Sequence, residues 1–257
     1  MVTVLEAIIL GVIQGITEWL PISSSGHLAI YQNLFRIDVP VAFDIFLHFG
    51  SLLVILFYFK NDLLKIVRSL ASGKFQSNES KFIFYVFVAS IPAGIVGFLF
   101  LDFFESLFSN LFIIGIAMIF NSLILFSTKF KSPNSEINMK KSFFVGIGQM
   151  LSIIPGISRS GSTISFGILS GIKREEAFKL SFIMAIPALL VANLLEINEL
   201  FKMREELHVL FFGFLTSIIV GFVSINILLN FIKKNKMHVF SYYSLVLGLS
   251  LILYTLF

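Results

Sequence analysis

The sequence predicts an all-α polytopic membrane protein that is built as an inverted-topology repeat, with six full transmembrane helices and two re-entrant helix pairs. Three observations predict this fold class. The chain has 257 residues, of which 57% are hydrophobic and only 13% are charged, far from the balance of a soluble domain. Apolar runs of about 20 residues, the length that spans a bilayer as a helix, recur along the chain. Two polar segments, each broken by proline, resemble one another at a constant spacing.

The first polar segment, residues 3–30, begins apolar and is then broken by the sequence LPISSSGH. Gln14 and Glu18 are four residues apart and share one face of the helix that Pro21 ends. Polar residues at this depth of an apolar segment indicate a re-entrant helix pair rather than a single span. The serines after the break are interpreted either as caps of the next helix or as part of a polar site: Ser23, Ser24 and Ser25.

Full-length apolar spans follow, and each is expected to cross the membrane as a helix. Their predicted positions are 42–59, 82–101, 110–128, 178–197, 208–232 and 239–257. On the first of these spans His48 stands four residues after Asp44, so the two share one helical face. They either face a cavity or form a buried hydrogen-bonded pair.

The second polar segment, residues 139–172, is broken at Pro155 and Gly156 in the sequence IPGISRSGST. Hydroxyl side chains and Arg159 stand where the next helix would begin, and a helix N-terminus with such groups suits a phosphate or a similar oxyanion. A charge near the bilayer centre costs at least about 2.5–3.5 kcal/mol on insertion scales, so Arg159 needs a partner or an aqueous cavity. A structural ion pair with Glu18 is the alternative, and it too requires the two polar segments to meet.

An internal duplication relates the two polar segments. A shift of 135 positions lays ISSSG on ISRSG and also brings Ala42 and Phe43 onto Ala177 and Phe178, in the spans that follow. A short chance match of serine and apolar residues is the alternative. We therefore expect one integral membrane domain, 1–257, with a first repeat at about 1–130 and a second at about 136–257. The other aligned identities are Gly11 with Gly146, Gln14 with Gln149, Ile22 with Ile157, Ser23 with Ser158, Ser25 with Ser160, and Gly26 with Gly161.

The distribution of charge predicts the orientation of the chain. A re-entrant pair and three full spans in each half place the second half upside down relative to the first, which is an inverted repeat. Of the 19 lysines and arginines, Arg159 is set aside as intramembrane, and all but three of the others then lie on one face. By the positive-inside rule that face is cytoplasmic and both termini are extracytoplasmic. The net charge of +4 thus indicates orientation and not nucleic-acid binding. The three exceptions are Arg36, Lys202 and Arg204.

Re-entrant loops from opposite faces would bring both broken segments together near the midplane. Their combined side chains suit phosphoryl transfer, and Glu18 with Gln14 offers oxygen ligands to Mg²⁺ or Ca²⁺. We favour Ser24 as the nucleophile, because it precedes His27 by three residues on one helical face. Attack by water with His27 as the base is the rival. The predicted catalytic residues are Glu18, Ser24, His27 and Arg159, and the predicted phosphate-binding residues are Ser23, Ser25, Gly26, Ser158, Arg159, Ser160 and Thr163.

The sequences GVIQGITEWLPISSSGHL and PGISRSGSTIS resemble the two signature motifs of the bacterial undecaprenyl-diphosphate phosphatases of the bacitracin-resistance family. In the first motif, Glu or Gln precedes Glu by four positions, and a serine-rich turn and a histidine follow. Many members carry Glu where this chain has Gln14, so the departure weakens a metal site built on two carboxylates. The residues that match the motifs are Gln14, Glu18, Ser24 and His27 in the first, and Pro155, Gly156, Ser158, Arg159, Ser160 and Thr163 in the second.

The resemblance implies an enzyme of the bacterial cell membrane that removes the terminal phosphate of a C55 polyprenyl diphosphate, with help from a divalent cation. Hydrolysis would regenerate the undecaprenyl phosphate carrier for peptidoglycan synthesis, and bacitracin would compete for the same lipid substrate. The resemblance leaves a homodimer open. The alternative is a flippase or transporter of lipid phosphates, because inverted repeats with broken helices are typical of secondary transporters.

Overall fold

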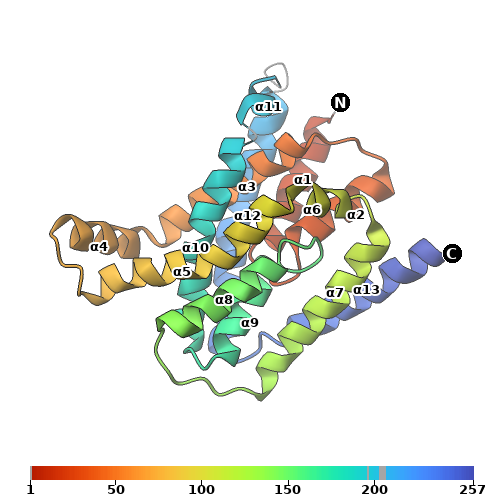
Figure 1. Cartoon of the computed structure of the whole chain (residues 1–257). Helices are drawn as coiled ribbons and strands as arrows, with labels where there is room; N and C mark the ends of the chain where they lie inside the picture. The colour runs from red at the N-terminus through yellow and green to blue at the C-terminus, as the bar shows by residue number, and fades with distance from the viewer. Residues whose placement is uncertain (1, 196, 203–206) are drawn as a thin grey trace.

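The computed structural model describes residues 2–195, 197–202 and 207–257, and the regular elements in this part of the chain are helices (Figure 1). The first half contains the helices α1 (Val4–Thr17), α2 (Ser24–Phe35), α3 (Val41–Tyr58), α4 (Lys60–Ala71), α5 (Asn78–Leu99), α6 (Leu101–Leu107) and α7 (Leu111–Ser127), followed by the short 3₁₀ helix η1 (Thr128–Phe130). The second half contains α8 (Met139–Leu151), α9 (Arg159–Leu169), α10 (Arg174–Leu195), α11 (Ile197–Lys202), α12 (Leu207–Lys233) and α13 (Val239–Leu256).

Six helices of the described chain are long and apolar enough to cross a membrane, and they confirm the six predicted spans. The chain is therefore a multi-pass membrane protein. The predicted and observed bounds agree within four residues; the largest differences are at the start of α5, at Asn78 rather than at 82, and at the start of α10, at Arg174 rather than at 178. Glu175 and Glu176 in its first turn extend the helix beyond the apolar run, because acidic residues are favourable at a helix N-terminus. Glu196, near the predicted end of this span, lies outside the described residues.

Each polar segment forms two short helices joined by an irregular turn, α1 with α2 and α8 with α9. With 14 residues, α1 is about 21 Å long, which is less than the thickness of the bilayer core. The proline predicted to end the first helix lies inside the turn that follows α1, and Pro155 lies in the turn between α8 and α9. Both breaks thus fall where the sequence predicts them. We call these two connections the first turn (residues 18–23) and the second turn (residues 152–158).

Three α-helices were not predicted, α4, α6 and α11, and all three are too short for a search based on membrane-spanning length. The helix α4 is amphipathic, with Ile66 and Ser69 buried while Leu64 and Lys65 are exposed. The seven-residue helix α6 follows α5 and has no buried residue. It matters for the site because it borders the cavities described below.

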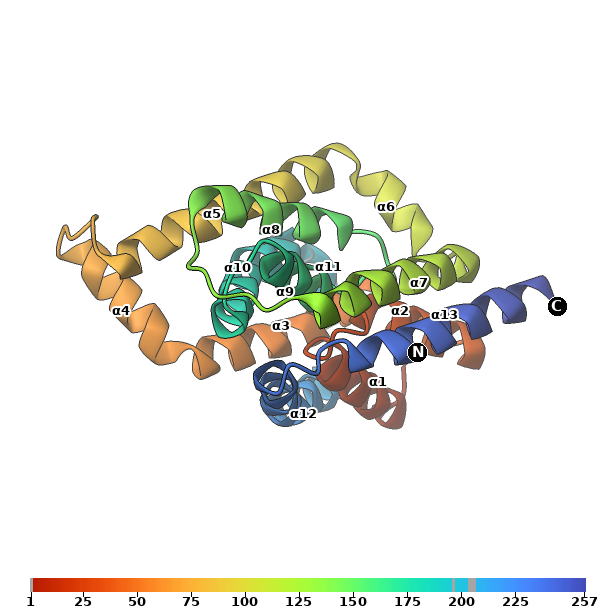
Figure 2. The ribbon, with the colours of Figure 1, turned by 90° about the horizontal axis from the view of Figure 1, so that it is seen from below.

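The second polar segment lies at the centre of the fold. Viewed from below, α9 stands near the middle, with α8, α10, α7 and α3 around it (Figure 2). Most residues of α9 are buried, and the ring of Trp19 from the first turn stacks on Phe182 of α10 with ring centroids 5.2 Å apart. The first turn is therefore held in the core, next to the helix that carries Arg159.

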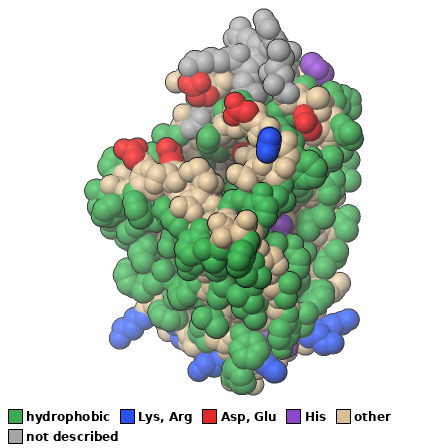
Figure 3. Space-filling model, turned by 90° about the vertical axis from the view of Figure 1, so that its right-hand side faces the viewer, with side chains coloured by type: hydrophobic (Ala, Val, Ile, Leu, Met, Phe, Trp, Pro, Cys, Tyr) green, Lys and Arg blue, Asp and Glu red, His purple; other side chains and the backbone are tan. Residues whose placement is uncertain are grey.

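Charged side chains gather at opposite ends of the molecule. On the face in Figure 3, lysine and arginine lie mainly along the bottom edge, acidic side chains lie near the top, and hydrophobic side chains cover the surface between them. An apolar belt between two charged ends is the surface expected of a protein embedded in a bilayer. Among the three predicted exceptions, Arg204 and the side chain of Lys202 lie outside the described residues.

Candidate active site

The two turns are joined by direct hydrogen bonds. The Gly156 N–H donates to the Ser23 hydroxyl oxygen at 3.2 Å, and the Ser160 hydroxyl donates to the Trp19 carbonyl at 3.2 Å. Both bonds are buried, and each crosses more than 130 residues of sequence. The prediction that the two polar segments meet is therefore confirmed.

Asn121 on α7 strengthens this junction and was missed by sequence reasoning. Its fully buried amide donates to the Pro21 carbonyl at 3.1 Å and accepts from the Ser158 N–H at 3.1 Å. One side chain thus satisfies a backbone group from each turn, which a buried irregular backbone requires. The signal in the sequence was a lone asparagine inside an otherwise apolar span.

Backbone strain is concentrated at the junction. Ser23 has φ of 74°, in a region that residues other than glycine rarely adopt. Gly156 has φ of 100°, and a Cβ atom there would lie 2.6 Å from the Ile114 carbonyl oxygen. The second turn can therefore approach α7 only with glycine at this position.

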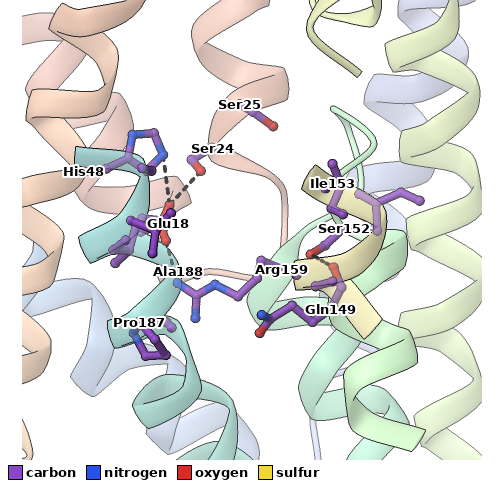
Figure 4. Close-up of a pocket in the computed structure, with 18 of the residues that line it drawn as sticks. Glu18, Ser24, Ser25, His48, Gln149, Ser152, Ile153, Arg159, Pro187 and Ala188 are labelled. Carbon is purple, nitrogen blue, oxygen red and sulfur yellow. Dashed lines mark hydrogen bonds and ion pairs between the residues drawn. The ribbon is translucent and has the colours of Figure 1, made fainter. Parts of the chain in front are cut away.

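The charged centre of the junction is the pair of Glu18 and Arg159 (Figure 4). Arg159 Nη2 lies 2.6 Å from Glu18 Oε1, and the carboxylate is 8% exposed. The other carboxylate oxygen accepts the Ser24 hydroxyl at 2.8 Å and the Gln14 amide at 3.3 Å. His48 Nε2 lies 3.5 Å from the same oxygen. A single carboxylate thus contacts four polar side chains from α1, α2, α3 and α9.

The ion pair between Glu18 and Arg159 is the one that the sequence analysis gave as the alternative to an anion-binding site. The arginine, however, also faces a cavity. Its Nη1 donates to the Ser181 carbonyl at a long 3.4 Å, and its guanidinium lies 5.7 Å from the centre of the Phe182 ring. Both Glu18 and Arg159 line a cavity. An anion in that cavity would find a guanidinium held in place by an aromatic ring below it and a carboxylate beside it.

This cavity, which we call the central cavity, has a volume of about 670 Å³. One end is polar and includes the charged pair with hydroxyl and amide side chains, and the other end is apolar and lies between α5 and α10. A cavity with one polar and one apolar end suits an amphiphilic ligand. The polar lining consists of Thr17, Glu18, Ser23, Ser24, Ser25, His48, Ser90, Gln149, Ser152, Ser158 and Arg159.

A second cavity of about 950 Å³ adjoins the central cavity and shares Ser25 and His48 with it. It lies between α2, α3 and α6, and its lining includes the charged residues Arg36, Asp38 and Glu105. His48 therefore faces a cavity, which was one of its two predicted interpretations. Asp44 forms no side-chain bond with His48; its carboxylate accepts from Gln32 at 2.7 Å, while the Asp44 carbonyl contacts His48 Nδ1 at 2.8 Å.

Some of the predicted site residues present their polar atoms to the cavity, whereas others use them in hydrogen bonds within the protein. Ser24 and Ser25 are half-buried and line the central cavity. The Ser23 and Ser158 hydroxyls accept the N–H groups of Gly26 and Gly161, at 3.3 and 3.1 Å, and so act as N-caps of α2 and α9.

Further along α9 the hydroxyls are bonded inside the protein. Ser160 donates to the Trp19 carbonyl, and Thr163 bonds to the Ser181 hydroxyl at 2.6 Å. Both side chains are at most 1% exposed, and neither lines the central cavity. Of the predicted phosphate-binding hydroxyls in the second segment, Ser158 therefore caps α9, whereas Ser160 and Thr163 hold α9 against its neighbours.

His27 lies apart from the charged centre. Its Nδ1 contacts the Ser23 carbonyl at 2.7 Å, its Nε2 contacts the Tyr243 hydroxyl at 2.7 Å, and its ring stacks on Tyr243. Because a carbonyl can only accept, Nδ1 carries a proton. The Ser24 hydroxyl is bonded to Glu18 instead. The role of His27 in proton transfer stays a prediction.

Gln149 and Ser152 line the central cavity but were not predicted as site residues. The Gln149 side chain is 6% exposed, and its Oε1 is buried without a hydrogen-bond partner among the described residues. Figure 4 shows its amide directed toward Arg159. The signal was present in the sequence, because Gln149 is the residue that aligns with Gln14 across the two repeats.

The predicted metal ligands, Glu18 and Gln14, could bind a divalent cation only if the substrate phosphate supplied further oxygen ligands. Within the described part of the chain, no group of three or more His, Cys, Asp or Glu side chains could hold a metal ion. Gln14 Oε1, however, is buried and has no partner there, beside the Glu18 carboxylate. Mg²⁺ is commonly bound through one or two carboxylates plus substrate phosphates. Glu18 and Gln14 would supply the protein oxygens of such a site.

A multi-pass helical protein with an arginine, a buried carboxylate and a serine at the polar end of an amphiphilic cavity belongs to the class of proteins that act on or carry anionic lipids. The chain belongs to the family described as "Bacitracin resistance protein BacA", which it matches over residues 7–250. Proteins named "Undecaprenyl-diphosphatase" are similar to it over nearly the full length of both chains. That of Alkaliphilus metalliredigens is 37% identical over 99% of each chain. Those of Korarchaeum cryptofilum and Methanobrevibacter smithii are 34% identical over 96% of this chain and 97% and 95% of theirs.

Proposed function

We propose that this chain is an undecaprenyl-diphosphate phosphatase, which hydrolyses the terminal phosphate of a polyprenyl diphosphate and regenerates the undecaprenyl phosphate carrier used in peptidoglycan synthesis. The observation that carries the proposal is the meeting of Glu18, Ser24 and Arg159 at the polar end of a cavity whose other end is apolar. Relatives named for this activity, which match nearly the whole chain, support it.

The Ser24 hydroxyl is the proposed nucleophile. Its oxygen attacks the terminal phosphorus, its proton passes to the Glu18 carboxylate that it already contacts at 2.8 Å, and the bond to the bridging oxygen breaks, releasing the lipid monophosphate. Water then cleaves the phosphoserine and releases inorganic phosphate. Arg159 binds the phosphate oxygens and stabilises the charge that develops on them. When the phosphate oxygens replace Glu18 as the partner of the Arg159 guanidinium, the Glu18 carboxylate is free to accept the proton from Ser24. The rival mechanism, direct attack by water with His27 as the base, predicts that loss of the Ser24 hydroxyl is tolerated.

We propose a divalent cation, Mg²⁺ or Ca²⁺, as the cofactor. Held by Glu18 and Gln14 Oε1, it would neutralise charge on the diphosphate. Among the other predicted phosphate-binding groups, Ser23, Ser25 and Ser158 line this cavity, whereas Gly26, Ser160 and Thr163 do not. Bacitracin is proposed to compete for the lipid substrate.

We propose that the two halves form an inverted repeat with re-entrant pairs α1–α2 and α8–α9. The packing supports this, since α1 packs on α12 while its counterpart α8 packs on α5, and α7 packs on its own counterpart α13. The charge distribution supports a bacterial cell-membrane orientation with both termini extracytoplasmic. The central cavity then opens toward the extracytoplasmic half, because the lining residues of α5 and α10 lie near the C-terminal ends of helices that start at the basic face.

Phosphate release from C55 diphosphate by the detergent-purified protein tests the proposed function. Release should require added Mg²⁺ or Ca²⁺, stop with chelator, and collapse in the Ser24→Ala and Arg159→Ala variants. Ser250→Ala is the matched control, because this exposed hydroxyl on α13 bonds only to the carbonyl of Val246 one turn earlier. No release from folded, lipid-supplied protein would sink the phosphatase and favour the flippase, which movement of labelled lipid by the Ser24→Ala variant would reveal.

A further inference from the structure

The apolar end of the central cavity is a cleft between two membrane-spanning helices. We call it the α5–α10 cleft, and its walls include Gly94, Gly97 and Phe98 of α5 and Ala188, Val191 and Leu195 of α10. Each helix carries a proline beside the cleft, Pro92 and Pro187. Because α5 and α10 are both long apolar helices of the membrane domain, an opening between them faces lipid and not water.

The glycines of this cleft leave room that nothing in the chain fills. A Cβ atom built on Gly94 meets no atom within 4 Å, and one on Gly97 meets only Ile153 Cδ1, at 3.5 Å. Glycines between α3 and α12 behave differently: a Cβ on Gly50 would collide with the Ser217 hydroxyl, and one on Gly221 would lie 2.8 Å from Trp19 Nε1. Between α3 and α12, glycine permits the helices to pack closely, whereas on α5 the glycines keep a space open.

A polar atom at the inner end of the cleft lacks a partner. Gln149 Oε1 is buried and unpaired, and its amide points into the central cavity beside Arg159 (Figure 4). A buried polar atom without a partner is costly, so such atoms usually meet a ligand or a water molecule. Oε1 can only accept, so a water molecule or a hydroxyl would be its donor, while the NH2 group of the same amide is the donor for a phosphate oxygen. The cavity thus has unmatched polar groups at its inner end and unfilled apolar space at its outer end.

We infer that the α5–α10 cleft binds the isoprenoid chain of the substrate and that Gly94 and Gly97 set its width. The inference rests on the proposed function and deepens it by assigning the tail-binding site. The ligand is an amphiphile whose diphosphate lies at Arg159 and Gln149 and whose first isoprene units leave sideways between α5 and α10 into the bilayer. The cleft and the polar end belong to one continuous cavity. A ligand with its diphosphate at the polar end would therefore place its own chain in the cleft, so we favour the substrate tail over an unrelated membrane lipid.

A Gly94→Phe variant tests the cleft by filling it, with Val223→Phe as the matched control on an exposed part of α12 outside both cavities. For Gly94→Phe, kcat/KM for C55 diphosphate should fall at least about tenfold further than kcat/KM for isopentenyl diphosphate, whose single isoprene unit leaves most of the cleft empty. Val223→Phe should match the unmodified chain on both substrates. Equal losses on the two substrates would overturn the cleft assignment alone. No phosphate release by the unmodified chain would overturn the proposed function, and this inference with it.

Chemical protection provides a measurement that does not depend on turnover. Because the chain has no cysteine, Gly94→Cys and Val223→Cys each introduce a single thiol. Undecaprenyl phosphate should slow alkylation of the thiol in Gly94→Cys at least about threefold and leave that in Val223→Cys unchanged, since only the first is covered by the bound chain. Equal rates with and without the lipid at both positions would place the tail elsewhere.

Discussion

The two turns occupy equivalent positions in the repeated sequence, and they meet in the fold, yet their hydroxyl groups do different work. In the first turn and the start of α2, Ser24 and Ser25 remain half-buried at the cavity wall. The equivalent positions in the second repeat hold Arg159, which faces the cavity, and Ser160, which is bonded to the Trp19 carbonyl. Under the proposed mechanism, the first of these two similar helix starts presents the nucleophile, Ser24, and the second presents the anion-binding charge of Arg159. The Ser160 hydroxyl joins the second helix start to the first turn.

The difference between the turns predicts that single substitutions will have very unequal effects. Variants at Arg159 and Ser24 should change catalysis, variants at Gln149 should change substrate binding, and variants at Ser160 should change stability. The predictions below start with the largest effect.

Replacing Arg159 should abolish most activity. Arg159→Ala removes the guanidinium that binds the phosphate, and charge-stabilising arginines in phosphoryl transfer are worth about 10³–10⁵ in kcat. We expect a loss of at least about 10³ in kcat/KM for C55 diphosphate, measured as phosphate release. Because the substitution also leaves the Glu18 carboxylate buried and unpaired, the protein is checked by size-exclusion chromatography. A folded variant within tenfold of the native rate would show that the ion pair is only structural.

Replacing Ser24 should cost almost as much if its hydroxyl is the nucleophile. Ser24→Ala removes the oxygen that contacts Glu18 at 2.8 Å, and we expect turnover to fall by about 10²–10³. In rapid-quench experiments, a burst of undecaprenyl phosphate, the product released when the phosphoserine forms, is expected for the native chain and should be absent in Ser24→Ala. Ser25→Ala keeps the Ser24–Glu18 bond and serves as the control, with a smaller loss. Near-normal turnover in Ser24→Ala would favour direct attack by water.

Replacing Gln149 should weaken substrate binding without weakening the fold. Gln149→Leu removes an amide that would bond to phosphate and should raise KM by about tenfold while kcat changes little. It also removes a buried, unpartnered oxygen, so thermal stability should stay equal or rise. A purely structural role predicts the reverse pattern, with lower stability and unchanged KM. Asn226→Leu on α12 is the control, because this amide bonds only to the Phe222 carbonyl of its own helix.

Much of the fold was predictable because membrane-spanning length and apolarity are strong local signals. The six spans and both proline breaks were predicted from sequence, and the charge of Arg159 required a partner that the structure supplies in Glu18. The helices α4, α6 and α11 were not predicted, since their short lengths carry no such signal.

The site was harder to predict than the fold, because sequence spacing describes one helix at a time. The spacing of Ser24 and His27 suggested a pair, but Glu18, which α1 places across the turn, takes the Ser24 hydroxyl, and Tyr243 from the far end of the chain contacts His27. Which hydroxyls are free is decided by packing between distant segments, as for Ser160 and Trp19. No local pattern reports such contacts.

Replacing Ser160 should have the smallest effect, and the effect should be on thermal stability and not on catalysis. Ser160→Ala deletes a buried bond between the turns and leaves the Trp19 carbonyl without this donor. Buried side-chain hydrogen bonds in membrane proteins contribute about 0.6 kcal/mol on average, so the thermal midpoint in detergent should fall by a few degrees at most. Phosphate release should stay within about threefold of the native rate, because Ser160 does not line the central cavity and its loss leaves Glu18, Ser24 and Arg159 in place. A loss comparable to that of Ser24→Ala would show that the second turn contributes a catalytic hydroxyl, and the division of work between the two repeats would then have to be abandoned.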